Sequence, residues 1–358
     1  MMRIADIRVY QKDLGTNRPY SISYKTVTEV KNTFVEIELD NGMIGIGACN
    51  PSEKVVGENV DQALQHLKEA DFSYLKRTRI SEFESLIRLT KENFEQWPGS
   101  HAAVDIALYD VFTKYLNISL GEFFGVRHKS MQTSITIGIK NVEKTLVEAK
   151  EYWKAGFRCI KVKTGLSPEE DAERILKINE KYPDVVLRVD ANQGYTPKDL
   201  ELFVNRTKGV DLELIEQPFP VERFAKDSKG LSQEVSRFLV ADESCRNPQD
   251  TLQLIKEVPN CPIFNIKLMK TGGLLQASKI ADMAELSGVN LMWGCNDESA
   301  VSITAAMHLA FSYPHTKYID LDGSLDLIQD VVETGFIIED GKMRPKGGVG
   351  LGVTLLGS

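Results

Sequence analysis

Five charged residues recur at nearly constant spacing in the middle of the chain, and each ends a short, mostly apolar run. Lys163, Asp190, Glu216, Asp242 and Lys267 follow one another at intervals of 25 to 27 residues. Side chains at the C-terminal ends of successive parallel strands meet on one face of a barrel, and that face carries the active site. A helix cap or a surface ion pair would explain one such position, but not five in register.

The three acids of this series, Asp190, Glu216 and Asp242, are expected on adjacent strands with their carboxylates on one side of the barrel mouth. Three hard oxygen ligands without thiolate or imidazole suit Mg²⁺, one ion per chain, with Mn²⁺ as a substitute. Asn192 follows Asp190 by two residues and is expected to orient its carboxylate from outside the ligand set.

The two lysines of the series, Lys163 and Lys267, end the second and sixth strands, which lie opposite each other in a ring of eight. A substrate whose carboxylate binds the metal would hold its α-carbon between the two amines. One lysine would remove the α-proton and the other would return a proton to the opposite face. The pair therefore predicts a two-base 1,1-proton transfer through an enediolate, with inversion at the α-carbon.

Lys161 shares the face of Lys163, because side chains alternate along a strand with a period of two. Its ammonium, the metal and partial burial would each lower the pKa of Lys163 and favour the neutral amine that a base requires. Lys161 is also a candidate ligand for the substrate carboxylate. At the eighth strand, the same period places Asp320 and Asp322 of YIDLDG on one face, where they are expected to bind a cation such as an ammonium group. The alternative is that Asp322 only starts the turn at Gly323.

Short β-rich runs alternate with helical stretches through the second part of the chain, which indicates parallel βαβ units. Eight such units favour a closed (β/α)₈ barrel over a doubly wound open sheet, which would need a glycine-rich turn after its first strand. The expected strands are 133–138, 157–163, 185–190, 212–216, 238–242, 263–267, 289–293 and 318–322.

The first part of the chain is expected to be an α+β segment. Runs 3–11 and 33–40 alternate as strands do, Asn41-Gly42 is a hairpin signal, and 101–117 has helical periodicity. The tail from about 323 has no such rhythm and is expected to pack on the N-terminal segment.

The composition is that of a soluble globular protein, with 42% hydrophobic and 26% charged residues among 358. A net charge of -8 without basic blocks disfavours nucleic acid and anionic membranes as partners. No signal sequence or membrane span is evident, and five scattered cysteines predict reduced thiols in a cytoplasmic protein. The histidines form no ligand pair.

The motifs KVK, VDANQGY, IEQP, ADES and NIKLMKTGG, in this order, resemble the muconate-lactonising subgroup of the enolase superfamily. The resemblance covers nearly the whole chain. It implies an α+β capping domain over 1–126, a modified TIM barrel, (β/α)₇β, over 127–322, and a C-terminal segment, 323–358, that completes the capping domain.

Within this subgroup, the Asp320–Asp322 pair is similar to that of the dipeptide epimerases, in which it holds the substrate's ammonium group. The resemblance implies Mg²⁺ ligation by the three acids, acid/base catalysis by Lys163 and Lys267, and electrostatic help from Lys161. Thr136 matches a substrate contact. SISYKTV (21–27) matches a mobile flap, in which Lys25 replaces an arginine that Ala-Glu epimerases use for glutamate.

The chain departs from that pattern at GCNDES (294–299), where Asn296, Asp297 and Glu298 are candidate substrate contacts. The extra acid could pair with Lys25 or favour a non-acidic second residue. The expected substrate is an Ala-Xaa dipeptide with Xaa hydrophobic or Glu, and a homo-oligomer is compatible with the sequence. Cycloisomerisation, o-succinylbenzoate formation on the same site, and a non-catalytic structural role are the alternatives.

Overall fold

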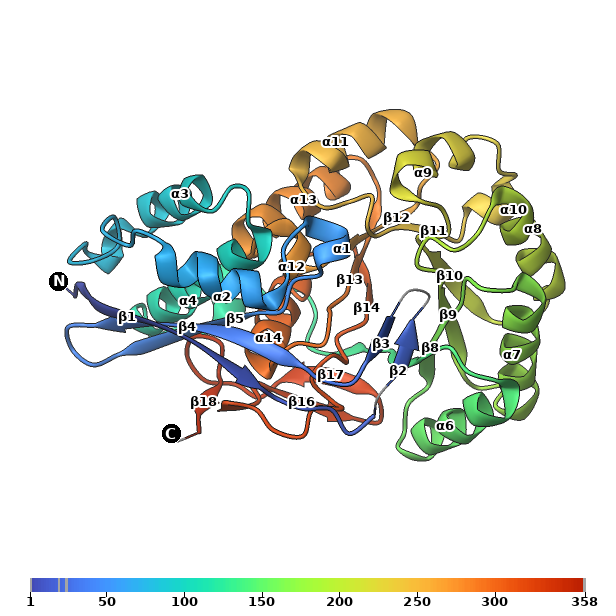
Figure 1. The fold of residues 1–358 in the computed structure, drawn as a ribbon, viewed down its shortest axis with the longest axis horizontal. Helices are drawn as coiled ribbons and strands as arrows, with labels where there is room; N and C mark the ends of the chain where they lie inside the picture. The colour runs from blue at the N-terminus through green and yellow to red at the C-terminus, as the bar shows by residue number, and fades with distance from the viewer. Residues whose placement is uncertain (1, 19, 23–24, 357–358) are drawn as a thin grey trace.

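The computed structural model describes residues 2–18, 20–22 and 25–356, with side chains for 2–18 and 28–356. The predicted α+β segment is present as an antiparallel sheet of order β1-β4-β5, covered by helices (Figure 1). Its elements are β1 (Ile4–Asp13), β2 (Tyr20–Ile22), β3 (Lys25–Val27), β4 (Lys31–Leu39), β5 (Ile44–Cys49), α1 (Glu53–Val56), α2 (Val60–Glu69), the 3₁₀ turn η1 (Ile80–Glu82), α3 (Phe83–Asn93), α4 (Pro98–Tyr115) and α5 (Leu120–Phe124).

Helix α4 packs between the sheet of the capping domain and helices of the barrel and is buried on nearly every side, not on one face as the periodicity predicted. It begins three residues earlier than expected, at Pro98, a residue suited to the first helical turn. One side packs on β4 and β5, and the other contacts helices of the barrel. Contact with the sheet is close because β5 carries glycine there: a Cβ on Gly47 would lie 1.9 Å from the carbonyl oxygen of Ala103.

The barrel prediction is confirmed, in its (β/α)₇β form. In the described part of the chain, eight strands pair in parallel and in chain order, and a bridge between Thr133 and Ile319 joins the two ends. A helix follows each strand except the last. The strands are β7 (Ile135–Ile137), β8 (Cys159–Lys163), β9 (Val186–Asp190), β10 (Leu212–Glu216), β11 (Leu239–Ala241), β12 (Ile263–Ile266), β13 (Asn290–Trp293) and β14 (Thr316–Ile319).

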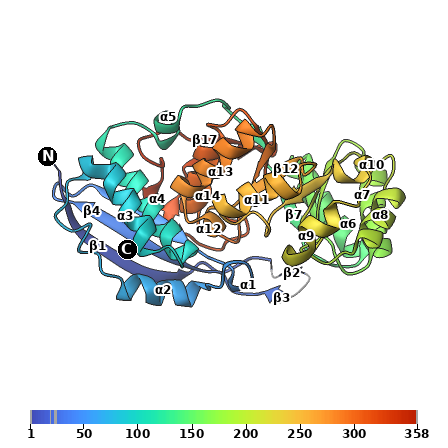
Figure 2. The same cartoon turned by 90° about the horizontal axis from the view of Figure 1, so that it is seen from above.

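The barrel helices form an outer layer, and those between β8 and β11 lie at the end of the molecule remote from the capping domain (Figure 2). The full set of barrel helices is α6 (Val142–Lys154), α7 (Pro168–Lys181), α8 (Pro197–Arg206), α9 (Val221–Ser228), α10 (Gln233–Ser236), α11 (Pro248–Glu257), α12 (Leu268–Thr271), α13 (Leu274–Leu286) and α14 (Ala300–Ala310).

The tail returns to both parts of the molecule. Leu327 forms a bridge with Thr16, and the backbone N–H of Leu351 donates to Asp110 of α4 at 2.8 Å. The tail strand β17 pairs with β6 on one side and with β16 on the other, in a sheet of order β16-β17-β6. The elements are β6 (Met131–Gln132), β15 (Val332–Glu333), β16 (Phe336–Glu339), β17 (Lys342–Pro345) and β18 (Thr354–Leu355).

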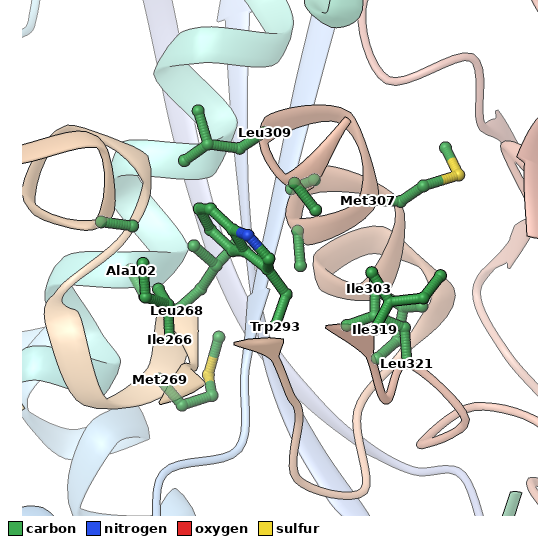
Figure 3. Packing of buried hydrophobic residues seen from close by; sticks show 14 of the residues in the cluster. Ala102, Ile266, Leu268, Met269, Trp293, Ile303, Met307, Leu309, Ile319 and Leu321 are labelled. Atoms are coloured by element: carbon green, nitrogen blue, oxygen red, sulfur yellow. The ribbon is translucent and has the colours of Figure 1, made fainter. Parts of the chain in front are cut away.

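Trp293, the last residue of β13, is fully buried and links strand to helix at this end of the barrel. Figure 3 shows its ring between Leu268 of α12 and Ile303 of α14. The indole N–H donates to Thr316 Oγ1 at 3.0 Å, so the polar edge of the ring is satisfied. Within residues 2–18, 20–22 and 25–356, no helix has the length and apolar character to cross a membrane.

We predict that Gly47→Ala destabilises the protein by about 2 kcal/mol or more, because the new methyl group must push α4 away from β5. Gly230→Ala is the control, since its Cβ would meet nothing within 4 Å and it should change stability by less than about 0.5 kcal/mol. Urea unfolding measures both variants, and equal stabilities would contradict the prediction.

Candidate active site

The five charged residues at the strand ends converge at one end of the barrel. Lys163, Asp190 and Glu216 are the last residues of β8, β9 and β10, whereas Asp242 and Lys267 directly follow β11 and β12. The three acids are essentially buried, and both lysines retain a little exposure. The sequence spacing therefore located a compact cluster of buried charge.

Each acid of the cluster contacts at least one lysine. Lys163 Nζ lies 2.6 Å from Asp190 Oδ2, and Lys267 Nζ lies 2.7 Å from Asp242 Oδ2. Lys267 Nζ is also 3.7 Å from Glu216 Oε1. Because β8 and β12 are four strands apart in the ring, these two ammonium groups approach the acids from opposite sides.

Lys161 lines the pocket together with Lys163, and its ammonium group contacts three acids. Its side chain is 2% exposed, and Nζ lies 2.5 Å from Glu216 Oε2, 2.7 Å from Asp320 Oδ2 and 3.3 Å from Asp190 Oδ2. Burial alone would lower the pKa of Lys161, but the surrounding carboxylates hold this pKa well above its ordinary value. Lys161 is thus an ammonium ion whose ion pairs connect β9, β10 and the segment after β14.

Two asparagines orient the same acids through hydrogen bonds, and a further buried carboxylate, Glu243, lies beside them. Asn265 Nδ2 donates to Glu216 Oε1 at 2.7 Å, and the backbone N–H of Asn192 donates to Asp190 Oδ1 at 2.9 Å, so both carboxylates are oriented. Glu243 Oε2 is buried without a hydrogen-bond partner. Burial, with neighbouring carboxylates, raises the pKa of Glu216 to about 8 and that of Glu243 to about 7. A divalent cation would compensate this concentration of negative charge, so the residues fit Mg²⁺.

The acids do not, however, form a preformed metal site. Among the described residues, no three His, Cys, Asp or Glu side chains come together in an arrangement able to hold a metal ion. Lysine ammonium groups bind Asp190, Glu216 and Asp242 directly in this structure.

Two members of the cluster were missed by the sequence analysis. Lys270 Nζ binds the Asp242 carboxylate, the Asp242 carbonyl oxygen at 2.6 Å and the Asn265 carbonyl oxygen at 3.0 Å. Glu243 lies beside Asp242 in the chain and on the pocket wall. Both belong to motifs already singled out, ADES and NIKLMKTGG, and Lys270 lies one helical turn after Lys267.

The Asp320–Asp322 pair differs from its prediction. Strand β14 ends at Ile319, so neither acid belongs to the strand and they do not share a strand face. Asp320 is buried and accepts from Ser134 Oγ at 2.6 Å and from Lys161 Nζ at 2.7 Å. Asp322 is partly exposed and accepts from the Thr136 backbone N–H at 2.7 Å; burial and Asp320 raise its pKa to about 7. Asp322 therefore presents the more accessible carboxylate.

One pocket brings most of the predicted residues together, between the barrel mouth, the capping domain and the tail. Glu298 was expected to contact substrate, but it is buried and accepts from the Asn296 N–H at 2.8 Å, which shapes the turn. The Lys25 side chain lies outside the described residues. The predicted residues that line the pocket are Thr136, Lys161, Lys163, Asn192, Asp242, Lys267, Asn296, Asp297, Asp320 and Asp322.

Comparison with known proteins identifies the family. Residues 5–125 match the mandelate racemase / muconate lactonizing enzyme N-terminal domain, and residues 144–357 match the enolase C-terminal domain-like family. The chain is 44% identical to the L-Lys-D/L-Arg epimerase of Desulforapulum autotrophicum over 98% of this chain and 99% of that one. It is 33% identical to the L-Ala-D/L-Glu epimerase of Thermotoga maritima, over 97% and 99% of the two chains.

The fold also matches that of a solved structure over nearly the whole chain. The dipeptide epimerase from Methylococcus capsulatus, complexed with Mg and L-Arg-D-Lys, superimposes with a TM-score of 0.95 at 41% identity, covering 98% of this chain and 99% of that one. The chain therefore belongs to the dipeptide epimerases of the mandelate racemase/muconate lactonizing enzyme family, in the enolase superfamily. It is an isomerase that acts on amino acid derivatives, as the sequence predicted.

Cys295 offers a probe of the charge on Asp322. Its Sγ lies on the pocket wall, 3.9 Å from Asp322 Oδ1, and burial together with this carboxylate holds the thiol pKa well above its ordinary value. We predict that Asp322→Asn speeds alkylation of Cys295 at pH 8.5 about tenfold, because loss of the negative charge lowers the thiol pKa by about one unit.

Mass spectrometry after iodoacetamide treatment measures this rate. Asp282→Asn, which changes an exposed acid on α13, is the control and should leave it unchanged. Equal rates in both variants would mean that the Asp322 carboxylate does not act on this thiol.

Proposed function

We propose that this chain is a Mg²⁺-dependent epimerase of dipeptides with cationic side chains, which inverts the α-carbon of the C-terminal residue. One observation carries the proposal: Lys163 and Lys267 stand on opposed strands, with carboxylates from the strands between them, in a pocket that also exposes Asp322. This arrangement suits a substrate that has a carboxylate at one end and an ammonium group at the other.

Asp190, Glu216 and Asp242 are the residues that would hold Mg²⁺, and Mn²⁺ is expected to substitute. When bound, the ion supplies electrostatic stabilisation of the negative charge that develops on a substrate carboxylate. Asn192 and Asn265 keep two of these carboxylates in position through the hydrogen bonds described above. Lys161 remains an ammonium ion and compensates the buried acids.

Lys163 and Lys267 exchange protons with the α-carbon from opposite faces. A neutral amine on one face takes the α-proton, and the C–H bond breaks with its electron pair delocalised into the carboxylate as an enediolate. The ammonium ion on the other face then gives a proton to the α-carbon, which forms the epimer. In the reverse direction the two lysines exchange roles, so both are required for inversion.

Asp322 is the acid that would receive the ammonium group of the first residue. It lies beyond β14, on the pocket wall, and the Thr136 N–H fixes its orientation. Asp320 is better suited to hold Lys161, since Ser134 and Lys161 already occupy its two oxygens.

The side chain of the second residue is proposed to be cationic, in place of the hydrophobic or Glu side chain expected from the sequence. Asp297 lies in the turn after β13, next to the strand that carries Lys267, and lines the pocket. Its carbonyl oxygen accepts from Asn50 Nδ2 at 2.7 Å, which fixes the turn against the capping domain. The similarity to epimerases named for L-Lys-D/L-Arg, at 44% and 42% identity, supports this class over the L-Ala-D/L-Glu class.

Proton NMR in D₂O tests the function. With Mg²⁺ and a library of Ala-Glu, Leu-Tyr, Lys-Lys and Arg-Arg dipeptides, we expect the cationic members to lose the α-proton signal of the C-terminal residue and gain the signals of a second diastereomer. EDTA should stop the reaction and added Mg²⁺ should restore it. Absence of exchange with every dipeptide would refute the proposal.

The two bases should have separable effects on the two epimers. We predict that Lys163→Ala and Lys267→Ala each abolish epimerisation, whereas each slows α-proton exchange of only one epimer, by about a hundredfold or more. The reason is that each lysine faces one side of the α-carbon. Exchange of both pure epimers in D₂O measures this, and equal losses for both epimers in both variants would contradict a two-base mechanism.

Asp297 should control preference for the second residue. We predict that Asp297→Asn lowers kcat/KM for Lys-Lys by about 10- to 100-fold, the effect of losing one charged hydrogen bond, and lowers that for Lys-Ala much less. Asp282→Asn should leave both values unchanged. A uniform decrease for the two substrates would exclude Asp297 from side-chain recognition.

A further inference from the structure

The segment that carries Lys267 rests on a helix of the capping domain. Lys267 precedes α12, and Gly272 and Gly273 connect this short helix to α13. The first backbone N–H of α13, that of Leu274, donates to Asp105 Oδ1 of α4 at 2.6 Å. Asp105 is fully buried.

Helix α13 has no cap of its own. Its N-cap residue is Gly273, which has no side chain to accept from the first turn, whereas helices commonly begin with Ser, Thr, Asp or Asn. Asp105 provides this acceptor from a different domain, about 170 residues earlier in the chain. The start of α13 therefore depends on α4.

The two glycines bring the loop directly against α4. A Cβ on Gly273 would lie 2.4 Å from Asp105 Oδ1, and a Cβ on Gly272 would lie 2.5 Å from His101 Nδ1. Helix α4 also contacts α12, and Figure 3 shows Ala102 of α4 beside Leu268 of α12. No side chain of the loop separates its backbone from these two residues, so a shift of α4 would move the loop.

The backbone of Lys163, the other proposed base, is held by a residue of the barrel and not of the capping domain. The carbonyl oxygen of Lys163 accepts from Arg174 Nη1 at 3.0 Å, and Arg174 belongs to α7 of the barrel. We propose that Asp105 is a positioning residue for Lys267, through which the capping domain sets one of the two bases and not the other. This inference rests on the proposed two-base function.

Asp110 provides a matched control on the same helix. It is also a fully buried aspartate that accepts backbone N–H groups, from Ile46 at 2.9 Å and Leu351 at 2.8 Å, but it does not contact the Lys267 segment. In Mg²⁺-loaded enzyme we expect Asp105→Ala to slow α-proton exchange of one epimer at least about tenfold more than that of the other. The more affected epimer should be the one whose exchange Lys267→Ala slows. Asp110→Ala should leave the ratio of the two rates unchanged.

Two further variants keep the test decisive. Asp105→Asn retains an oxygen acceptor and should restore the ratio, whereas Asp105→Glu, which moves the acceptor, should disturb it even if Asp105→Ala does not fold. Amide hydrogen exchange, without substrate, should show faster exchange of 268–275 in Asp105→Ala or Asp105→Glu but not in Asp110→Ala.

Equal slowing of both epimers, or unchanged protection of 268–275, would overturn the positioning role. Absence of epimer exchange in the unsubstituted enzyme would instead refute the proposed function, and the amide measurement would still decide whether Asp105 holds the segment.

Discussion

Buried side chains of opposite charge compensate each other at the barrel mouth. Isolated carboxylates or ammonium groups would be strongly destabilised in this environment, and each becomes tolerable only through close partners. Lys161 shows the solution most clearly, since acids from β9, β10 and the end of β14 surround one ammonium group.

The barrel alone does not complete the pocket. The turn after β13 is tied to the capping domain by Asn50, and the loop after β12 is tied to it by Asp105. Helix α4 can serve both neighbours because glycines allow close approach on each side, Gly47 of the sheet and Gly273 of the barrel. The capping domain therefore holds two turns whose residues line the pocket.

The strand-end residues could be predicted from sequence because βα units repeat with a nearly fixed length, so spacing alone put Lys163 and Lys267 on one face. Residues beyond the strand ends could not be predicted in this way. Asp320 and Asp322 leave the period-two pattern once β14 ends at Ile319, and Glu298 turns inward to hold a backbone N–H. The contacts of Lys161 depend on β9, β10 and the segment after β14, which no local pattern contains.

We infer that a divalent cation takes the place of lysine on Asp190, Glu216 and Asp242. A crystal structure with Mn²⁺, located by its anomalous scattering, tests it most directly. We expect one ion per chain, bound by oxygens of Asp190, Glu216 and Asp242, with Lys163 and Lys267 directed into the pocket. An ion bound elsewhere, or these lysines still on the same carboxylate oxygens at saturating Mn²⁺, would contradict it.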